Sequence, residues 1–528
     1  MKEYFRFCFG LREFLKNTIS LEESKEIIER RMEKREQSFL EIVKKGVYGN
    51  KRSPYLKLLR LSNYDFKDIE SLVLDVGIEE TLGILRRDGI YFTMEEFKGK
   101  KEVVRKGISF EVKERDFDNP FLSDCYEISS GATRSAGTRI RIDFDFLTQK
   151  SAYNVFMLDM YKALQSPIAL WFPIYPGAPG INSMLRFTKI GKPPLKWYSQ
   201  VEKWNRRISL KKRLGINYII YMGRALGAKF TKPEFADLDS ASKIAEWIST
   251  MIANFSTCLV YTFVSSAARI CLAANEKDLK IAGTKFIVTG EPLSPKKREV
   301  IESTGGIVIP VYGISEGGVI GAGCTERNAC DDVHLFKDSF AVIQHKRKVG
   351  LGNISVNAFL FTTLLPHAPK ILLNVETGDY GIVESRNCKC KFGELGFSDH
   401  IYNIRSFEKL TGEGVTFVGT DFIRIIEEVL PHKFGGTAMD YQVLEEEDDK
   451  GFTRLIVIVS PNIGEINEKD LLDTLFHELR TGKHASTPDT WSQAGPEMWS
   501  QAGMFQVKRM YPVPTRGMKV LPFHIAKS

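Results

Sequence analysis

Three short glycine-bearing clusters and one lysine near the C-terminus carry side chains that could act together on a nucleotide. The clusters are Ser129-Ser130-Gly131-Ala132-Thr133, Tyr312-Gly313-Ile314-Ser315-Glu316 and Thr377-Gly378-Asp379, and the lysine is Lys519, just after a glycine turn. In this order they could supply a phosphate loop, a metal-binding acid, a ribose-binding acid and a mobile cation. These are the groups needed to activate a carboxylate with ATP, because two anions that repel must be held in line.

The first cluster has the composition of a phosphate-binding loop. Small hydroxyl residues and glycine let backbone N–H groups approach phosphate oxygens closely, and the arginines that follow add positive charge. The expected contacts are Ser129, Ser130, Gly131, Thr133 and Arg134. An ordinary Ser/Gly/Thr turn is the alternative, and the cluster alone does not exclude it.

The second cluster follows a predicted strand, at the position where ligand crevices open in α/β sheets. Glu316 is expected to hold Mg²⁺ against the phosphates and Tyr312 to pack on a base, with Gly313 and Ser315 in the loop. The alternative is a turn that carries an exposed glutamate.

The third cluster ends an apolar run, residues 370–375, so Asp379 is expected at a strand end. A carboxylate there can accept hydrogen bonds from both ribose hydroxyls. Further on, Arg405 opens a charged connector, residues 404–414, and could bind ribose or phosphate at a domain junction. A turn aspartate and a surface arginine are the alternatives.

Cysteine and histidine residues near these clusters form a second candidate site. Thiolate and imidazole ligands suit tetrahedral Zn²⁺, and four of them leave no open coordination position, which favours a structural ion. Buried free thiols are the alternative, since a C-x-C pair is rarer than C-x-x-C in zinc sites. The expected ligands are His334, Cys388, Cys390 and either Cys324 or Cys330.

The elements that must position these residues point to an α/β protein. Residues 20–45 have the pattern of a charge-laced helix with an apolar stripe, and the first 107 residues look mainly helical. From residue 108 short β-branched and aromatic runs alternate with helices. The clearest strand–helix–strand unit joins 285–289 to 306–310 through a helix that opens at Ser294.

The pattern changes near residue 404 to a connector and then to a compact alternation of helices and strands. We therefore predict a large N-terminal α/β domain, residues 1–404, a hinge, and a small, mobile α+β C-terminal domain, residues 405–528. The elements expected in the small domain are a helix over 422–430, paired strands over 440–447 and 453–460, and a helix over 468–479.

Composition excludes several classes of protein. A chain of 528 residues exceeds the size of one core, while 43% apolar and 27% charged residues are ordinary for a globular protein. A net charge of +8 is modest, so no nucleic-acid partner is expected.

Eight scattered cysteines do not suggest a secreted disulfide framework, and no clean signal peptide begins the chain. The uncharged stretch 247–268 is rich in Ser, Thr and Asn and is expected to be a buried helix running into a loop, not a membrane span. A cytoplasmic location is therefore predicted.

Taken together, the ordered motifs resemble those of the adenylate-forming ligases, and within them the phenylacetate–CoA ligase-like branch. In that superfamily a Ser/Thr/Gly loop is followed by Gly-Glu-Pro, Tyr-Gly-x-Ser/Thr-Glu, Thr-Gly-Asp, a hinge arginine and a C-terminal lysine. The resemblance covers residues from about 50 to 520. The matching positions are Ser129–Thr133, Gly290-Glu291-Pro292, Tyr312–Glu316, Thr377–Asp379, Arg405 and Lys519.

The resemblance implies a two-step reaction in which a carboxylate attacks the α-phosphorus of ATP and a thiol or amine then displaces AMP. It assigns Mg²⁺ to Glu316, the ribose to Asp379, and the carboxylate and α-phosphate oxygens to Lys519. Residues Gly290, Glu291 and Pro292 would line the adenine pocket, and rotation about Arg405 would withdraw Lys519. It further implies a thiol such as that of CoA as the acceptor; some members of the branch hold a structural Zn²⁺ beside the nucleotide site, and family members are often homodimers.

Two departures keep alternatives open. Arg134 and Ser135 stand where the family loop commonly has glycine and lysine, and Ser406 stands where the hinge often has aspartate. An acyl-protein or amide synthetase, using a protein thiol, a carrier or an amine as acceptor, is the first alternative. A nucleotide-binding or scaffold protein without catalysis is the second. The sequence does not identify the carboxylic acid.

Overall fold

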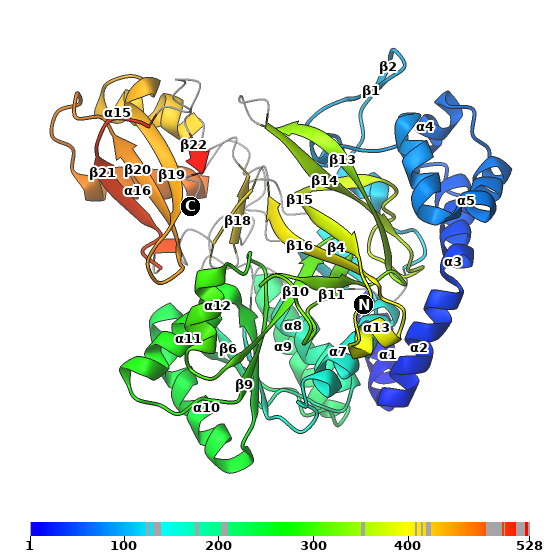
Figure 1. Cartoon of the computed structure of the whole chain (residues 1–528), viewed down its shortest axis with the longest axis horizontal. Helices are drawn as coiled ribbons and strands as arrows, with labels where there is room; N and C mark the ends of the chain where they lie inside the picture. Colours follow the sequence, from blue (N-terminus) through cyan, green and yellow to red (C-terminus); the bar gives the residue numbers. More distant parts are fainter. Residues whose placement is uncertain are drawn as a thin grey trace.

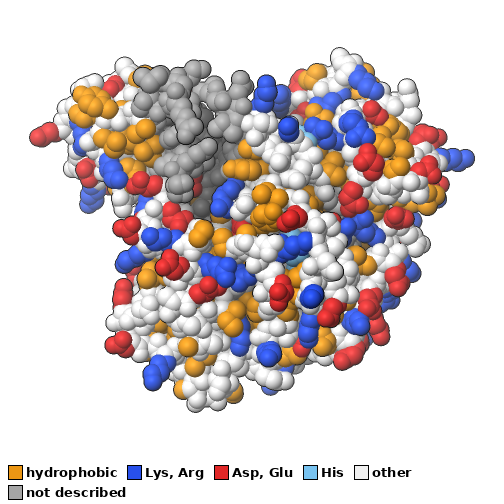
Figure 2. All heavy atoms as spheres, in the orientation of Figure 1, with side chains coloured by type: hydrophobic (Ala, Val, Ile, Leu, Met, Phe, Trp, Pro, Cys, Tyr) orange, Lys and Arg blue, Asp and Glu red, His pale blue; other side chains and the backbone are white. Residues whose placement is uncertain are grey.

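The computed structural model has a large body and a small body that lie side by side (Figure 1). It confirms the predicted fold class, a large α/β body followed by a small α+β body. On the face shown in Figure 2, Lys and Arg side chains are interspersed with Asp and Glu side chains over both bodies. The structure describes residues 2–122, 126–129, 139–174, 179–201, 210–349, 354–406, 409–412, 415–418, 424–481, 499–500, 502–513 and 523–525.

The N-terminal segment is mainly helical, as predicted. Three of its helices begin at capping boxes, in which Ser20, Asp65 and Thr93 bond the backbone three residues on. A short hairpin, β1 (Val103–Arg105) with β2 (Ile108–Phe110), ends the segment. The helices are α1 (Lys2–Lys16), α2 (Leu21–Glu33), α3 (Arg35–Glu41), the π-helical η1 (Ile42–Tyr48), α4 (Tyr55–Leu61), α5 (Phe66–Arg87) and α6 (Met94–Phe97).

A sheet of twelve strands forms the core of the large body, in the order β13-β14-β15-β16-β12-β11-β10-β9-β8-β5-β6-β7. The half from β10 to β7 is parallel, and the predicted strand–helix–strand unit is confirmed as β9, α12 and β10. Its strands are β5 (Ile168–Trp171), β6 (Lys196–Ser199), β7 (Pro233–Phe235), β8 (Cys258–Phe263), β9 (Thr284–Thr289) and β10 (Ile307–Ile314). Its helices are α7 (Phe144–Met160), α8 (Pro179–Lys189), α9 (Leu210–Ala225), α10 (Ala241–Phe255), α11 (Val264–Glu276) and α12 (Pro295–Glu302).

The uncharged stretch 247–268 differs from the expected helix and loop. Helix α10 ends at Phe255, and strand β8 and the start of α11 follow. All six residues of β8 are buried, because helices cover both faces of a parallel sheet and leave no polar alternation to mark the strand. None of the helices in the described ranges has the length and apolarity needed to cross a membrane.

The other half of the sheet, from β11 to the edge strand β13, is antiparallel. Its last strand along the chain, β16, runs through Ser406, so the charged connector predicted from residue 404 begins as a sheet strand. Buried Ile401 and pairing with β15 hold it there. The elements are β11 (Gly318–Ala322), β12 (Val333–Leu335), β13 (Phe340–Val349), β14 (Ile354–Thr363), β15 (Val375–Ser385), α13 (Lys391–Glu394) and β16 (Asp399–Ser406).

The small body is a four-stranded sheet in the order β21-β20-β19-β22, with helix α16 packed against it. The predicted strand pair and both predicted helical regions are confirmed. A hairpin, β17 (Lys409–Gly412) with β18 (Val415–Val418), precedes it. Its elements are η4 (Ile425–Val429), α15 (Leu430–Phe434), β19 (Tyr441–Glu447), β20 (Thr453–Val459), α16 (Glu468–Thr481), β21 (Phe505–Arg509) and β22 (Phe523–Ile525).

The β19–β20 turn joins the small body to the large one. Ser294 Oγ, at the start of α12, donates to Glu447 Oε1 at 2.8 Å. The Arg269 guanidinium of α11 lies 4.5 Å from the centre of the Phe452 ring. The contact therefore falls directly beside the predicted adenine-lining segment 290–292.

Candidate active site

The base of the first cluster is a two-stranded hairpin. Ser129 is the last residue of β3 (Tyr126–Ser129) and pairs with Arg139, the first residue of β4 (Arg139–Ile142). The Arg139 guanidinium lies 3.9 Å from Asp118. The predicted phosphate contacts Ser130, Gly131, Thr133 and Arg134 lie outside the described residues, as does Lys519.

The second and third clusters meet in the structure. Tyr312 Oη, near the end of β10, donates to Asp379 Oδ2 at 2.9 Å. Asp379 is 8% exposed, and its other oxygen accepts from the Ser406 hydroxyl of β16. Gly378 reaches Asp379 through a φ of +89°, which L side chains rarely adopt. Since β10 and β15 are four strands apart in the sheet order, the antiparallel half must curl to bring them together.

Tyr312 also links the two acidic residues of the prediction. Burial raises the pKa of the Tyr312 phenol well above its usual value, and the charges of Asp379 and Glu316 add to the effect. The hydroxyl therefore stays protonated and donates to Asp379. In this arrangement Tyr312 orients the ribose-binding candidate with its hydroxyl, while its ring contacts Phe361 at 6.3 Å between centroids.

Glu316 lies in the tight β10–β11 turn and is 7% exposed. A Cβ on Gly313 would stand 3.0 Å from the carbonyl oxygen of Gly318, so a glycine suits this turn. Glu316 Oε1 accepts from Lys98 Nζ at 2.7 Å. The alternative reading, a turn with an exposed glutamate, is therefore wrong, because this carboxylate is paired and buried.

A row of alternating charges connects Glu316 to the base of the first cluster. Lys370 Nζ lies 2.7 Å from Asp118 Oδ1 and 3.2 Å from Glu114 Oε1. Burial raises the pKa of Glu114, against the lowering effect of Lys98 and Lys370. Asp118 in turn faces Arg139. The hairpin base at Arg139 and the predicted metal-binding acid Glu316 thus belong to one polar region.

Arg405 pairs in register with Tyr380, next to the Asp379–Ser406 pair. Its guanidinium donates to Asp331 Oδ2 at 3.3 Å and its side chain is 42% exposed. Asp331 also accepts from the backbone of residues 403 and 404, which fixes this strand end. Arg405 therefore stands beside the ribose-binding candidate, where the large sheet ends.

The segment 290–292 presents its backbone outward and its acid inward. Gly290 has φ +82° and Pro292 is exposed. The fully buried Glu291 carboxylate accepts from the Ser265 hydroxyl and lies 3.4 Å from Lys297 Nζ. Only the backbone and Pro292 are therefore presented for an adenine contact, while Glu291 ties this loop to α11 and α12.

The cysteine cluster is compact and buried. One ligand atom from each of Cys324, His334, Cys388 and Cys390 lies within 4.8 Å of all the others. Cys390 Sγ is 3.1 Å from His334 Nε2, and Cys324 Sγ is 3.7 Å from Cys388 Sγ. Of the two cysteines left open by the sequence, Cys324 joins the cluster, while Cys330 Sγ donates to the Leu293 carbonyl at 2.9 Å.

The donor set fits Zn²⁺. His334 Nδ1 lies 2.7 Å from the Phe397 carbonyl oxygen, so Nδ1 carries the proton and the Nε2 lone pair faces the thiols. A hydrogen bond with Cys324 and the nearby His334 lower the pKa of the Cys390 thiol to about 3, against the effect of burial. Such a set of three thiols and one imidazole matches a closed tetrahedral zinc site.

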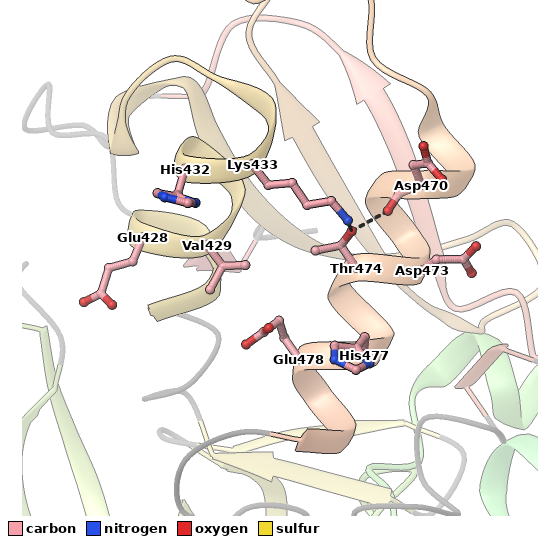
Figure 3. A pocket seen from close by; sticks show the side chains of 9 residues that line it. All are labelled: Glu428, Val429, His432, Lys433, Asp470, Asp473, Thr474, His477 and Glu478. Atoms are coloured by element: carbon pink, nitrogen blue, oxygen red, sulfur yellow. Dashed lines mark hydrogen bonds between the residues drawn. The ribbon is translucent and has the colours of Figure 1, made fainter.

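A separate cavity of about 810 Å³ lies in the small body, between η4–α15 and α16 (Figure 3). His432 and Lys433 line it from α15, and Asp470, Asp473 and His477 from α16. Lys433 Nζ donates to Thr474 Oγ1 at 2.6 Å. None of the predicted site residues that the structure describes lines it.

Sequence reasoning missed several members of the polar region. Lys98 belongs to a charged stretch, Glu95 to Lys101, that reads as an exposed helix end. Lys370 opens an apolar run and Ser406 stands where an aspartate was expected. No local pattern distinguishes these side chains from surface residues, because their partners lie more than two hundred residues away or, for Ser406, on a neighbouring strand.

No protein-family model matches the chain, and no curated protein matches it. Among solved structures, the chain is similar to a 2-hydroxyisobutyryl-CoA ligase in complex with 2-HIB-AMP and CoA, with 12% identity, a TM-score of 0.49, and coverage of 96% of this chain and 91% of that one. It is also similar to an o-succinylbenzoate CoA synthetase from Bacillus subtilis, with 12% identity, a TM-score of 0.39, and coverage of 75% and 67%. An amide bond synthetase from Marinactinospora thermotolerans gives 10% identity, a TM-score of 0.37, and coverage of 73% and 66%. Two of these proteins are a CoA ligase and a CoA synthetase and the third is an amide bond synthetase, and none of the three is a phenylacetate–CoA ligase. At this identity the likeness concerns the fold alone, so the chemistry has to come from this chain's own side chains.

Proposed function

We propose that this protein is an ATP-dependent, AMP-forming carboxylate ligase that makes an acyl-adenylate and transfers the acyl group to a thiol such as that of CoA. The observation that carries the proposal is the contact between the second and third clusters. Tyr312 donates a hydrogen bond to Asp379, and the charge of Glu316 helps to raise the pKa of the Tyr312 phenol. This contact supports one nucleotide site built from both motifs.

In the first step the carboxylate oxygen attacks the α-phosphorus of ATP, and pyrophosphate leaves. Asp379 would accept hydrogen bonds from the ribose hydroxyls, since a carboxylate is an acceptor on both of its oxygens. Backbone groups of residues 290–292 would face the adenine. Positioning the two reactants in this way supplies much of the rate enhancement.

Glu316 would hold Mg²⁺, which would neutralise the phosphate charge as pyrophosphate leaves. The carboxylate is suited to this role because it is mostly buried, lies in a tight turn and already binds a cation, the Lys98 ammonium. The row of charges that runs from Glu316 to Arg139, at the base of the first cluster, supports this role.

In the second step a thiol attacks the acyl carbon and AMP leaves. Lys519 is proposed to hold the carboxylate and α-phosphate oxygens in the first step alone, and rotation of the small body after Arg405 would withdraw it. The contact of the β19–β20 turn with the start of α12, next to residues 290–292, supports this proposal. Cys324, His334, Cys388 and Cys390 would hold a structural Zn²⁺ that braces β12 against the segment after β15.

The test is product analysis with a panel of aryl and fatty acids. With ATP, Mg²⁺ and CoA, one or more acids should stimulate formation of AMP and pyrophosphate, and Asp379→Ala should abolish the stimulation. Formation of ADP and phosphate, or an unaffected Asp379→Ala variant, would reject the proposal. If AMP forms with an amine or a carrier thiol but not with CoA, the acyl-protein or amide synthetase alternative holds instead.

A further inference from the structure

Lys98 is held in place by a short helix, α6, that is tied to the strand carrying Asp379. The Met94 backbone N–H donates to the Glu376 carboxylate at 3.4 Å, three residues before Asp379. The neighbouring Glu95 pairs with Arg347, which also pairs with Glu376. These contacts fix the backbone before Lys98, so the direction of its side chain is set by the large body.

The Lys98 ammonium lies between two carboxylates. Its Nζ is 2.7 Å from Glu316 Oε1, and the side chains of Lys98 and Glu316 are 14% and 10% exposed. Burial lowers the pKa of Lys98, but the Glu316 and Glu114 charges outweigh this and leave the pKa above its usual value. The group is therefore a permanent cation, and a small part of the Lys98 and Glu316 side chains remains exposed.

Two cations, Mg²⁺ and the Lys98 ammonium, then compete for the Glu316 carboxylate. A magnesium ion coordinates carboxylate oxygen at about 2.0–2.1 Å, and Lys98 already lies within hydrogen-bond distance of the same carboxylate. Two cations on one mostly buried carboxylate repel each other, because the interior screens charge poorly. The pair becomes stable when further negative charge enters, and the triphosphate of ATP brings it.

We propose that Lys98 is a polyphosphate-binding residue of the nucleotide site. Without nucleotide its ammonium neutralises Glu316, and when ATP enters with its metal the ammonium moves to oxygens of the β- and γ-phosphates. This inference rests on the proposed function. It also supplies the phosphates with a cation from outside the first cluster. Just after that cluster, Arg134 and Ser135 stand where the family commonly has glycine and lysine.

The alternative is that Lys98 only neutralises Glu316 and never touches the nucleotide. The two roles differ in which nucleotides respond. A phosphate contact matters for ATP and not for AMP, because AMP lacks the β- and γ-phosphates. A purely structural partner would affect both nucleotides equally, through the shape of the site.

The first experiment is calorimetry of nucleotide binding without a carboxylic acid, so that no reaction occurs. Lys98→Met should weaken Mg·ATP binding about 10–100-fold, as expected for the loss of a charge-assisted hydrogen bond, and should leave AMP binding within about twofold. Lys98→Arg should fall between the two. Lys101→Met, which removes an exposed lysine from the same segment, should match the wild type.

A second pair of variants distinguishes the two roles if loss of the Lys98–Glu316 pair destabilises Lys98→Met and lowers its affinity for AMP as well. In EDTA, Glu316→Gln should bind ATP several-fold tighter than the wild type, because the ammonium is released to the phosphates. Adding Lys98→Met to Glu316→Gln should remove this gain. Equal ATP affinities for these two variants, or a wild-type ATP affinity in Lys98→Met, would overturn the inference. A wild-type protein that binds neither ATP nor AMP would instead overturn the proposed function and this inference together.

Discussion

Glu445 should make the contact between the two bodies sensitive to pH. It lies on β19, two residues before Glu447, whose carboxylate accepts from Ser294. Burial raises the pKa of Glu445 from 4.5 to about 7, and the nearby Lys297 and Arg405 offset only part of that rise. The protonated form therefore suits the docked position.

The sign and size follow from linkage. Because the pKa is higher in the folded protein than in the unfolded chain, the folded protein binds more protons between these two values. The stabilisation is present at low pH and is lost as the pH rises through about 7. Taking 1.36 kcal/mol per pKa unit, the loss between about pH 5.5 and about pH 8 is roughly 2 kcal/mol.

The perturbation is Glu445→Gln, which keeps the shape of the side chain and cannot ionise. Urea titration with hydrogen-exchange labelling of the β19–β20 peptide gives the unfolding free energy of the small body. We expect Glu445→Gln to be more stable than the wild type at both pH values, with an advantage that grows by roughly 2 kcal/mol between about pH 5.5 and about pH 8. Glu446→Gln, which removes the exposed partner of Lys508, is the matched control and should show no such trend. A difference that is constant with pH, or that favours the wild type at high pH, would show that Glu445 is ionised beside Lys297 and Arg405.

Three further predictions concern the proposed site and can be tested on the same protein. Asp379→Asn should raise the dissociation constant for AMP about 10–100-fold while leaving the binding of 2′,3′-dideoxy-AMP nearly unchanged in calorimetry; equal losses for both nucleotides would argue against a ribose contact. The purified protein should contain about one zinc per chain, and removing it with a chelator, or replacing Cys390 with serine, should lower the thermal midpoint, whereas Cys330→Ser should not change the zinc content. Lys519→Ala should stop acid-dependent exchange of pyrophosphate into ATP but spare thiol transfer from a supplied acyl-adenylate; loss of both half-reactions to the same extent would contradict the division of roles.

Much of the fold could be predicted because the signals are local. The helix over residues 21–33 shows its capping box in Ser20 and Glu23, and the β9–α12–β10 unit shows β-branched strands around a helix that opens with Ser294 and a proline. The β19–β20 hairpin likewise shows alternating strands around a polar turn. Strand β8 was missed because complete burial removes the alternation that marks a strand.

The candidate site was only partly predictable, because its partners are set by tertiary packing. Asp379 was expected at a strand end because of the apolar run before it, but this was wrong, since it lies inside β15, and its contacts with Tyr312 and Ser406 depend on the curl of the sheet. The cluster of Cys324 with Cys388 depends on the pairing of β12 with β16, so spacing alone could not choose between Cys324 and Cys330. Lys98 reaches Glu316 across 218 positions of sequence, and no local pattern reports such a pair.

The central claim is that a carboxylate becomes joined to the α-phosphate of ATP. The most direct measurement uses an acid from the panel that carries ¹⁸O in both carboxylate oxygens, with ATP, Mg²⁺ and CoA, and mass spectrometry of the AMP released. If the acid attacks the α-phosphorus, one ¹⁸O must pass into AMP when the acyl group leaves, and the other must stay in the thioester. AMP without ¹⁸O, formed together with the labelled thioester, would contradict an acyl-adenylate intermediate.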